Sequence, residues 1–272
     1  MSEATFAVVD TETTGLSPAH HHRIIEIAVV ELDREGNELG HWTTLVNPER
    51  DVGASDIHGI SPADLFEAPI FSGIAADLAQ RLQGRILVAH NLPFDLDFLV
   101  SEYLRLGVLV PLSRSMGLCT MRLAGQYLPW AGRSLAACTE AVGGSIETAH
   151  AALHDARAAA GILRHLLAQG PGMEQLWQPV LEAVRLLSWP TLDLSPRPLR
   201  PRTAGCARPQ VHFLSRLVSR MPRETILPAA DSYLALVDRV LLDRFISKHE
   251  EKELVSLAET LGLSREEALQ CH

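Results

Sequence analysis

The chain has 272 residues, of which 47% are hydrophobic and 21% are charged, and its net charge is −9. This composition is typical of a globular protein with room for one large domain and a smaller addition. No apolar run approaches the ~18 residues of a membrane span, and Glu3 stands where a signal peptide carries basic residues, so we expect a cytoplasmic protein with no membrane partner.

The cysteines and the distribution of charge further restrict the classes of protein to which the chain can belong. The four cysteines are scattered without a CxxC spacing, which predicts reduced thiols and neither a disulfide framework nor a zinc site. Residues 1–170 carry all of the net negative charge. This argues against a broad surface that grips phosphates, but it is compatible with nucleic acid held locally through bound metal ions.

Two acids separated by one residue, Asp10 and Glu12, follow the apolar run at residues 6–9. If residues 5–10 form a strand, alternation places both carboxylates on one face, where the strand leads into a turn. Two like charges in one small site are costly unless a proton or a cation lies between them, and Mg²⁺ or Mn²⁺ suits such oxygen ligands. A solvated strand end is the alternative at this point.

The segments that follow predict a β-meander. Residues 23–32 and 40–46 have strand composition, and residues 33–37 between them form a turn. Glu26 lies inside the first of these strands, either as a site acid or as a hydrogen-bonded supporting group. His58 precedes a helix start at Ser61-Pro62, where either a substrate contact or a structural role is compatible with the sequence.

A helix at 70–82 and a wholly apolar strand at 85–89 predict a buried parallel strand covered by helices. Asp95 comes just beyond this strand, at the start of an amphipathic segment that runs to residue 106. It is either a helix N-cap or a site acid. Asp97 is expected to be a solvent-facing acid in the first turn.

A long alanine-rich helix is predicted to follow residues 150–155 and to end near residue 169, after a shorter helix at 134–142. Asp155 is an isolated acid on this apolar segment, and His150 lies five residues before it. His154 is adjacent to Asp155, and neighbouring residues on a helix do not face each other. We therefore favour His150 over His154 as a site residue.

The last third of the chain differs in composition. We expect the first domain to end with a helix at 175–187 and to be followed by a Pro/Arg-rich linker at 188–209, which is either a plain linker or a weak electrostatic contact for nucleic acid. Residues 210–272 predict a small all-α appendage. Its last helix is very short, which suggests that the chain is a fragment of a longer one.

Four acids and one histidine thus recur at the ends of predicted elements: Asp10, Glu12, Asp95, Asp155 and His150. Two divalent ions ~4 Å apart can hold a phosphodiester, lower the pKa of a water and stabilise the leaving oxygen. A histidine is suited to accept the proton of that water near neutral pH.

With DTETTG at 10–15, HNLPFD at 90–95 and HAALHD at 150–155, the chain resembles the DEDDh 3′-to-5′ exonucleases, which include the proofreading epsilon subunit of bacterial DNA polymerase III. The resemblance covers residues 4–170 and implies an α/β, ribonuclease-H-like mixed sheet flanked by helices. It also implies two Mg²⁺ or Mn²⁺ ions, with His150 as the general base. The implied metal ligands are Asp10, Glu12, Asp95 and Asp155, and the implied substrate contacts are Thr13, Leu16 and His58.

The expected activity is removal of 5′-mononucleotides from a single-stranded or frayed 3′ end, with DNA favoured, in proofreading or repair. Exoribonuclease activity in RNA processing and an inactive adaptor are the alternatives. The appendage weakly resembles an incomplete tellurite-resistance TerB-like helical module, which implies an interaction module and not a second active site. A replication or repair protein is the expected partner of the C-terminal helices.

Overall fold

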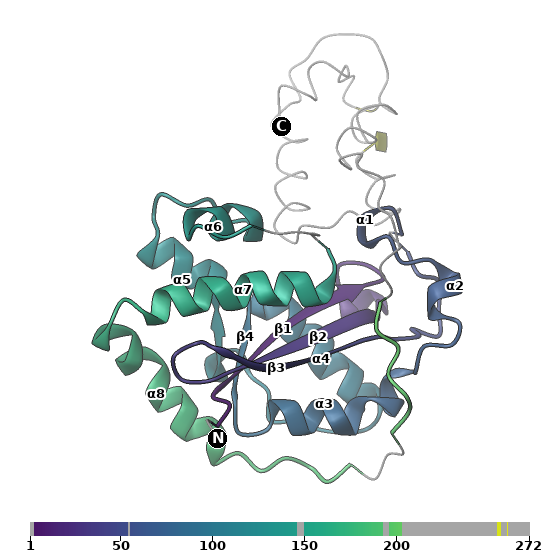
Figure 1. The fold of residues 1–272 in the computed structure, drawn as a ribbon. Coiled ribbons are helices and arrows are strands. Elements are labelled where there is room, and N and C mark those ends of the chain that lie inside the picture. The colour runs from purple at the N-terminus through teal and green to yellow at the C-terminus, as the bar shows by residue number, and fades with distance from the viewer. Residues whose placement is uncertain are drawn as a thin grey trace.

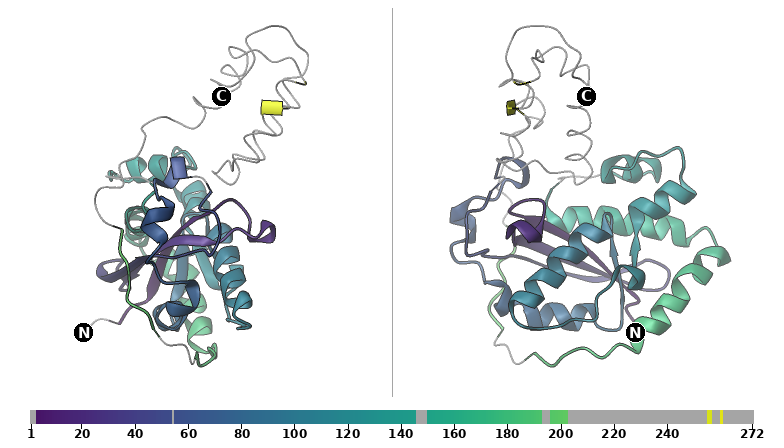
Figure 2. Two further views of the ribbon diagram at one scale, coloured as in Figure 1. Left: turned by 90° about the vertical axis from the view of Figure 1, so that its right-hand side faces the viewer. Right: turned by 180° about the vertical axis from the view of Figure 1, so that it is seen from behind.

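The computed structural model describes residues 3–53, 55–145, 150–192 and 196–202, together with residues 255–256 and 260. In these segments a five-stranded sheet lies between two layers of helices (Figures 1 and 2). The strands are β1 (Phe6–Thr13), β2 (Ile24–Leu32), β3 (Glu38–Leu45), β4 (Ile86–Ala89) and β5 (Gly117–Cys119). The helices are α1 (Ser55–His58), α2 (Pro62–Leu65), α3 (Ala75–Leu82), α4 (Leu92–Arg105), α5 (Thr120–Tyr127), α6 (Leu135–Ala141), α7 (Ala152–Leu167) and α8 (Pro171–Arg185).

The sheet is mixed, as the sequence predicts. Its strand order is β3-β2-β1-β4-β5, with the first three strands antiparallel and with β4 and β5 parallel to β1. The expected β-meander is therefore confirmed, and so is the parallel strand at its side. β1 lies in the middle of the sheet, so its residues contact neighbours on both edges.

The alternation of side chains along β1 determines which helices each residue faces. Val8 belongs to the hydrophobic core that includes residues of α5, α6, α7 and α8, whereas Val9 belongs to the core that includes residues of α3 and α4. Helices cover both faces, which explains why β1, β2 and β4 are almost continuously apolar. Asp10 and Glu12 are in phase with Val8, and their side chains therefore lie on the α7 side of the sheet.

Several boundaries differ from those expected. β1 continues to Thr13 instead of ending near Asp10, because Thr11 and Glu12 pair with β2. The helix expected at 70–82 is divided into a 3-10 turn (Phe71–Gly73) and α3. α4 begins at Leu92, which places Asp95 in the first turn and Asn91 at the N-cap, so an N-cap role for Asp95 is wrong.

Among the strands and α-helices, α1, β5 and α5 were not predicted, and His58, which was expected in a loop, is the last residue of α1. β5 has only three residues and its apolar pattern is too short to distinguish a strand from a loop. Within the part of the chain that the structure describes, no helix is long and apolar enough to cross a membrane.

The predicted linker is described at residues 188–192 and 196–202, and the predicted appendage at 210–272 lies outside the described residues except for 255–256 and 260. Residues 196–202, here called the strap, run beside β3 (green at the right of Figure 1). The Leu45 amide donates to the Arg200 carbonyl at 2.8 Å, and the Arg200 amide donates to Thr44 Oγ1 at 3.0 Å. This part of the linker is therefore bonded to the first domain.

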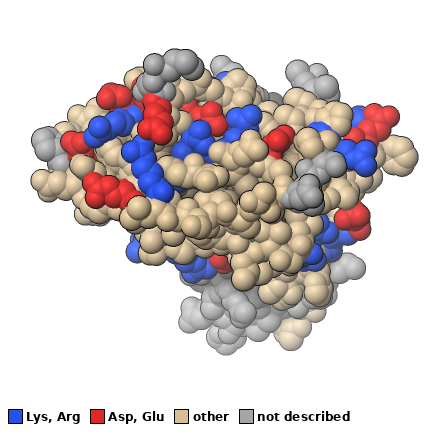
Figure 3. Space-filling view, turned by 90° about the horizontal axis from the view of Figure 1, so that it is seen from below, with Lys and Arg blue, Asp and Glu red and all other residues tan. Residues whose placement is uncertain are grey.

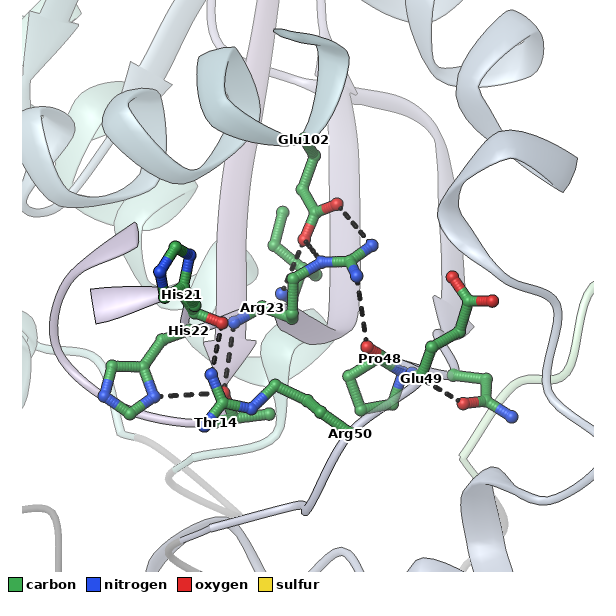
Figure 4. Close-up of polar contacts among 10 residues, drawn as sticks. Thr14, His21, His22, Arg23, Pro48, Glu49, Arg50 and Glu102 are labelled. Atoms are coloured by element: carbon green, nitrogen blue, oxygen red, sulfur yellow. Dashed lines mark hydrogen bonds and ion pairs between the residues drawn. The ribbon is translucent and has the colours of Figure 1, made fainter. Parts of the chain in front are cut away.

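A buried ion pair fastens the start of β2 to α4 (Figure 4). Arg23 Nε and Nη2 donate to the two carboxylate oxygens of Glu102 at 2.7 and 2.8 Å. Glu102 is 2% exposed and also accepts from the Ile24 amide, while Arg23 Nη1 donates to the Pro48 carbonyl. One bidentate pair thus joins three segments around the loop that follows β1.

Replacing Arg23 with Met should lower the free energy of unfolding by about 3 kcal/mol or more, because it leaves the Glu102 carboxylate buried without its partner. Urea denaturation measures this change. The control is Arg114→Met, which removes an exposed pair with Asp97 and should cost less than about 1 kcal/mol. Equal losses in the two variants would contradict the assignment of the Arg23 pair as a structural fastening.

Candidate active site

The acids of β1 lie where the strand passes beneath the start of α7. Glu12 is 2% exposed, and Asp10 is partly buried. Glu12 is paired directly with Glu26 on β2, and Asp10 with Ala28. Three carboxylates therefore share the α7 side at one end of the sheet.

Asp95 approaches β1 from α4. Its Oδ1 accepts a hydrogen bond from the Thr11 amide at 3.0 Å and another from Thr11 Oγ1 at 2.8 Å. Thr11 is the residue between the two acids of β1, so these bonds fix the strand against α4 at the point where the acids project. Thr11 was not anticipated as part of the site, because a threonine in a strand is ordinary.

Asp155 lies in the first turn of α7, and His150 lies just before that helix. Asp155 Oδ2 accepts a hydrogen bond from the His150 amide at 2.7 Å. Potential ligand atoms of Glu12, His150 and Asp155 all lie within 4.8 Å of one another. The structure thus brings residues from β1 and from the start of α7 into one cluster.

The carboxylates are close enough to affect each other's ionisation. Burial raises the pKa of Asp10 well above its ordinary value. Repulsion from neighbouring carboxylates raises it further, and in decreasing order of effect these are Asp155, Asp95, Glu12 and Glu26. In the metal-free protein at neutral pH, ionisation of this whole group is therefore unfavourable.

The donor set fits a hard divalent cation. Carboxylate oxygens with one imidazole suit Mg²⁺ or Mn²⁺ better than soft metals, which prefer thiolates. The negative charge that raises the pKa of Asp10 is the charge that a cation would offset. The cluster of Glu12, His150 and Asp155 is therefore a credible metal centre, with Asp10 and Asp95 beside it.

Glu26 is a buried, hydrogen-bonded residue, which agrees with the interpretation of Glu26 as a supporting group. Its Oε2 accepts from the Ala152 amide in the first turn of α7 at 3.3 Å and from Arg202 Nη1 at 3.1 Å. Burial raises the pKa of Glu26, and the charge of Arg202 opposes that increase. Glu26 therefore anchors α7 to the sheet beneath the acidic cluster.

The three expected substrate contacts differ in exposure. Leu16 is half-buried, whereas Thr13 and His58 are fully buried. The Thr13 hydroxyl donates to the Gly15 carbonyl at 2.7 Å, and His58 Nδ1 accepts from the Ile60 amide at 3.0 Å. Both side chains therefore also shape their own loops.

The residues ranked lower by the sequence lie elsewhere. His154 lines a different cavity of about 400 Å³ between α6 and α7. Asp97 is exposed and pairs with Arg114 at 2.7 Å. Arg202 beneath the site was not anticipated, because nothing in a Pro/Arg-rich segment distinguishes one arginine from the others.

A family model described as "Exonuclease" (RNase_T) matches residues 7–163. The chain therefore belongs to this exonuclease family.

Curated relatives agree. The DNA polymerase III subunit epsilon of Rickettsia felis is 35% identical over 162 residues, which cover 57% of this chain and 71% of that protein. The epsilon subunit of Rickettsia typhi is 42% identical over 104 residues, or 38% of this chain and 45% of the relative. A DNA polymerase III subunit epsilon-like protein of Rhodobacter capsulatus is 36% identical over 173 residues, which cover 61% of this chain and 24% of that protein. The chain spans less than half of the length of the last two relatives.

Solved structures share the fold. The nuclease domain of 3′hExo, described as a DEDDh family member bound to rAMP, superposes with a TM-score of 0.52 at 20% identity, over 61% of this chain and 92% of that one. Escherichia coli Exonuclease I in complex with a dA16 oligonucleotide superposes with a TM-score of 0.53 at 20% identity, over 66% of this chain and 43% of that one. The expected ribonuclease-H-like fold is confirmed.

The raised pKa of Asp10 predicts the pH dependence of stability in EDTA. The folded state binds the Asp10 proton more tightly than the unfolded state does, so the contribution of Asp10 to the free energy of unfolding should fall as pH rises above about 4, the ordinary pKa of aspartate. Asp10→Asn should reduce this fall and should be more stable than the wild type at pH 7. Thermal unfolding in EDTA across pH measures both effects, with exposed Asp51→Asn as the control. An Asp10→Asn variant that is less stable than the wild type at pH 7 would contradict the inferred repulsion between Asp10 and the neighbouring carboxylates.

Proposed function

We propose that this protein is a metal-dependent 3′-to-5′ exonuclease that hydrolyses the terminal phosphodiester of DNA and releases 5′-mononucleotides. The observation that carries the proposal is the meeting of Glu12, His150 and Asp155 beside Asp10, inside the segment that matches the exonuclease family model. Metal-dependent hydrolysis of a phosphodiester requires acids that hold the cations and a base that accepts a proton. The cluster contains both kinds of residue.

In this proposal Asp10, Glu12, Asp95 and Asp155 hold two Mg²⁺ or Mn²⁺ ions. When bound, such ions neutralise charge on the phosphate and lower the pKa of the attacking water. The protein contributes the placement of its acids: Thr11 orients Asp95, and the His150 amide orients Asp155. Asp10 lies in the field of all the other acids of the cluster, so its loss should be more damaging than the loss of Glu12.

His150 is the proposed general base. Imidazole titrates near neutral pH and can accept the proton of a water that attacks the phosphorus. Its ring lies with Glu12 and Asp155, and its backbone precedes α7 in a conformation with φ of +58°. The same placement is compatible with a metal ligand, so the two roles need separate measurements.

We infer that DNA is the substrate, because relatives at 35–42% identity are named as DNA polymerase III subunit epsilon. Thr13, Leu16 and His58 are the proposed contacts for the terminal nucleotide. On the face seen in Figure 3, basic and acidic side chains are interspersed, which does not favour a long electrostatic track for nucleic acid on that face. We propose that a single-stranded or frayed 3′ end is held at the metal centre.

The same names support a replication or repair protein as a partner. We propose that it contacts the part of the chain beyond the strap, which stays predicted to be a helical appendage. A cytoplasmic location is part of the proposal, and two buried cysteines, Cys119 and Cys138, are compatible with it.

Asp95→Asn and Asp155→Asn should each abolish Mg²⁺-dependent shortening of a 5′-labelled single strand, because a neutral amide neither holds the cation as well nor keeps the charge of the cluster. Asp97→Asn is the matched control: it lies two residues from Asp95 on the same helix, and its exposed side chain should leave the rate unchanged. Wild-type activity in Asp95→Asn or Asp155→Asn would overturn the site.

The assay should use matched single-stranded DNA, duplex DNA with a mismatched 3′ end, and RNA, with analysis of the products. Faster release of 5′-mononucleotides from the two DNA substrates is the expected result. Faster digestion of RNA would favour the exoribonuclease, and no release from any substrate would favour an inactive adaptor.

His150→Asn should lower kcat by about 10²-fold or more, which is the scale of general acid–base catalysis. Asparagine is chosen because it tolerates positive φ. Titration of the variant with Mn²⁺ by calorimetry separates the two roles of this residue. Metal affinity close to that of the wild type supports the general base, whereas loss of metal binding would make His150 a ligand instead.

A further inference from the structure

Arg202, at the end of the strap, extends beneath the proposed active site. Its Nη1 donates to the His150 carbonyl at 3.0 Å and to Glu26 Oε2 at 3.1 Å. Its Nη2 donates to the His58 carbonyl. The side chain is 12% exposed, so the guanidinium is largely removed from water.

These bonds join the loop that contains His58 to the loop that contains His150. His58 ends α1, and His150 precedes α7, far along the chain. The planar guanidinium can donate in several directions at once, which a lysine cannot do with the same geometry. One side chain from the strap therefore fixes the distance between the loop of the proposed nucleotide pocket and the loop of the proposed base.

The backbone of His150 needs such support. Its φ of +58° is in the left-handed region, which costs a non-glycine residue free energy unless its surroundings hold it there. Asp155 accepts from the amide of His150, and Arg202 donates to its carbonyl. Both the amide and the carbonyl of His150 are therefore hydrogen-bonded to side chains.

Arg202 also compensates the charge of a buried carboxylate. Glu26 is 2% exposed, and a carboxylate buried to this degree is costly without a compensating partner. Arg202 supplies that partner, while Glu26 also accepts from the Ala152 amide at the start of α7. The ion pair consequently connects the strap to the helix that carries Asp155.

We propose that Arg202 is a positioning residue of the active site, which the strap supplies from outside the segment matched by the exonuclease family model. It holds the His150 and His58 loops in the arrangement that turnover requires. This inference rests on the proposed exonuclease function.

The test compares full-length Arg202→Ala, Arg202→Lys and Arg200→Ala. Arg202→Ala should lower kcat about 10- to 100-fold, because small displacements of reacting groups have effects of that size, and it should also raise KM as the His58 loop moves. A variant that only lost stability would contain less active enzyme and keep the KM of the wild type. Arg202→Lys should fall between wild type and Arg202→Ala.

Arg200→Ala is the matched control, because its side chain belongs to the same strap but pairs with Glu67 at the surface. It should keep the kcat and KM of the wild type. Wild-type kinetics in Arg202→Ala, or an unchanged KM with a lower kcat, would overturn the positioning role.

Hydrogen exchange in the absence of metal and substrate tests the same residue without activity. In Arg202→Ala the Ile60 amide, which donates to His58, and the His150 amide should exchange faster, while amides of α4 keep their rates. Exchange that matches the wild type in both loops would overturn the inference even if the protein is an exonuclease. An inactive wild type would instead overturn the proposed function and leave the exchange result to decide the role of Arg202.

Discussion

Repulsion among carboxylates at one end of β1 is the constraint on which the rest of the site depends. Asp10 and Glu12 project on the same side of the strand, and two helices add Asp95 and Asp155 to the same region. Such a group is costly in a folded protein without cations, as the raised pKa of Asp10 indicates. The structure keeps it together by giving acids fixed hydrogen-bond donors: Thr11 for Asp95, the His150 amide for Asp155, and the Ala152 amide for Glu26.

Helix N-termini contribute to the same balance. Asp95 and Asp155 both lie in first turns, where amide groups have no partner within the helix and the helix dipole favours negative charge. α4 covers one face of the sheet and α7 covers the other. The acids therefore reach the end of β1 from both faces, and the sheet itself fixes the distance between them.

Ion pairs then attach the surrounding loops to this frame. Arg23 and Glu102 hold the segment after β1 against α4 (Figure 4), and Arg202 and Glu26 hold the strap against the start of α7. In both pairs the carboxylate is 2% exposed, and the arginine also donates to a backbone carbonyl of another loop. Both pairs therefore attach loops to elements that carry acids of the cluster, α4 with Asp95 and α7 with Asp155.

Features that depend on local pattern could be predicted from the amino-acid sequence. Alternation along a strand places Asp10 and Glu12 on one face wherever the strand ends, and the apolar run before Asp95 is a buried parallel strand because only a sheet covered on both faces accepts it. The order of motifs also indicated the exonuclease family. Only the tertiary structure decided which donors hold these acids. Thr11 and Asp95 are 84 residues apart, and Glu26 and Arg202 are 176 residues apart. No local period relates residues at such separations, because packing of whole elements brings them together.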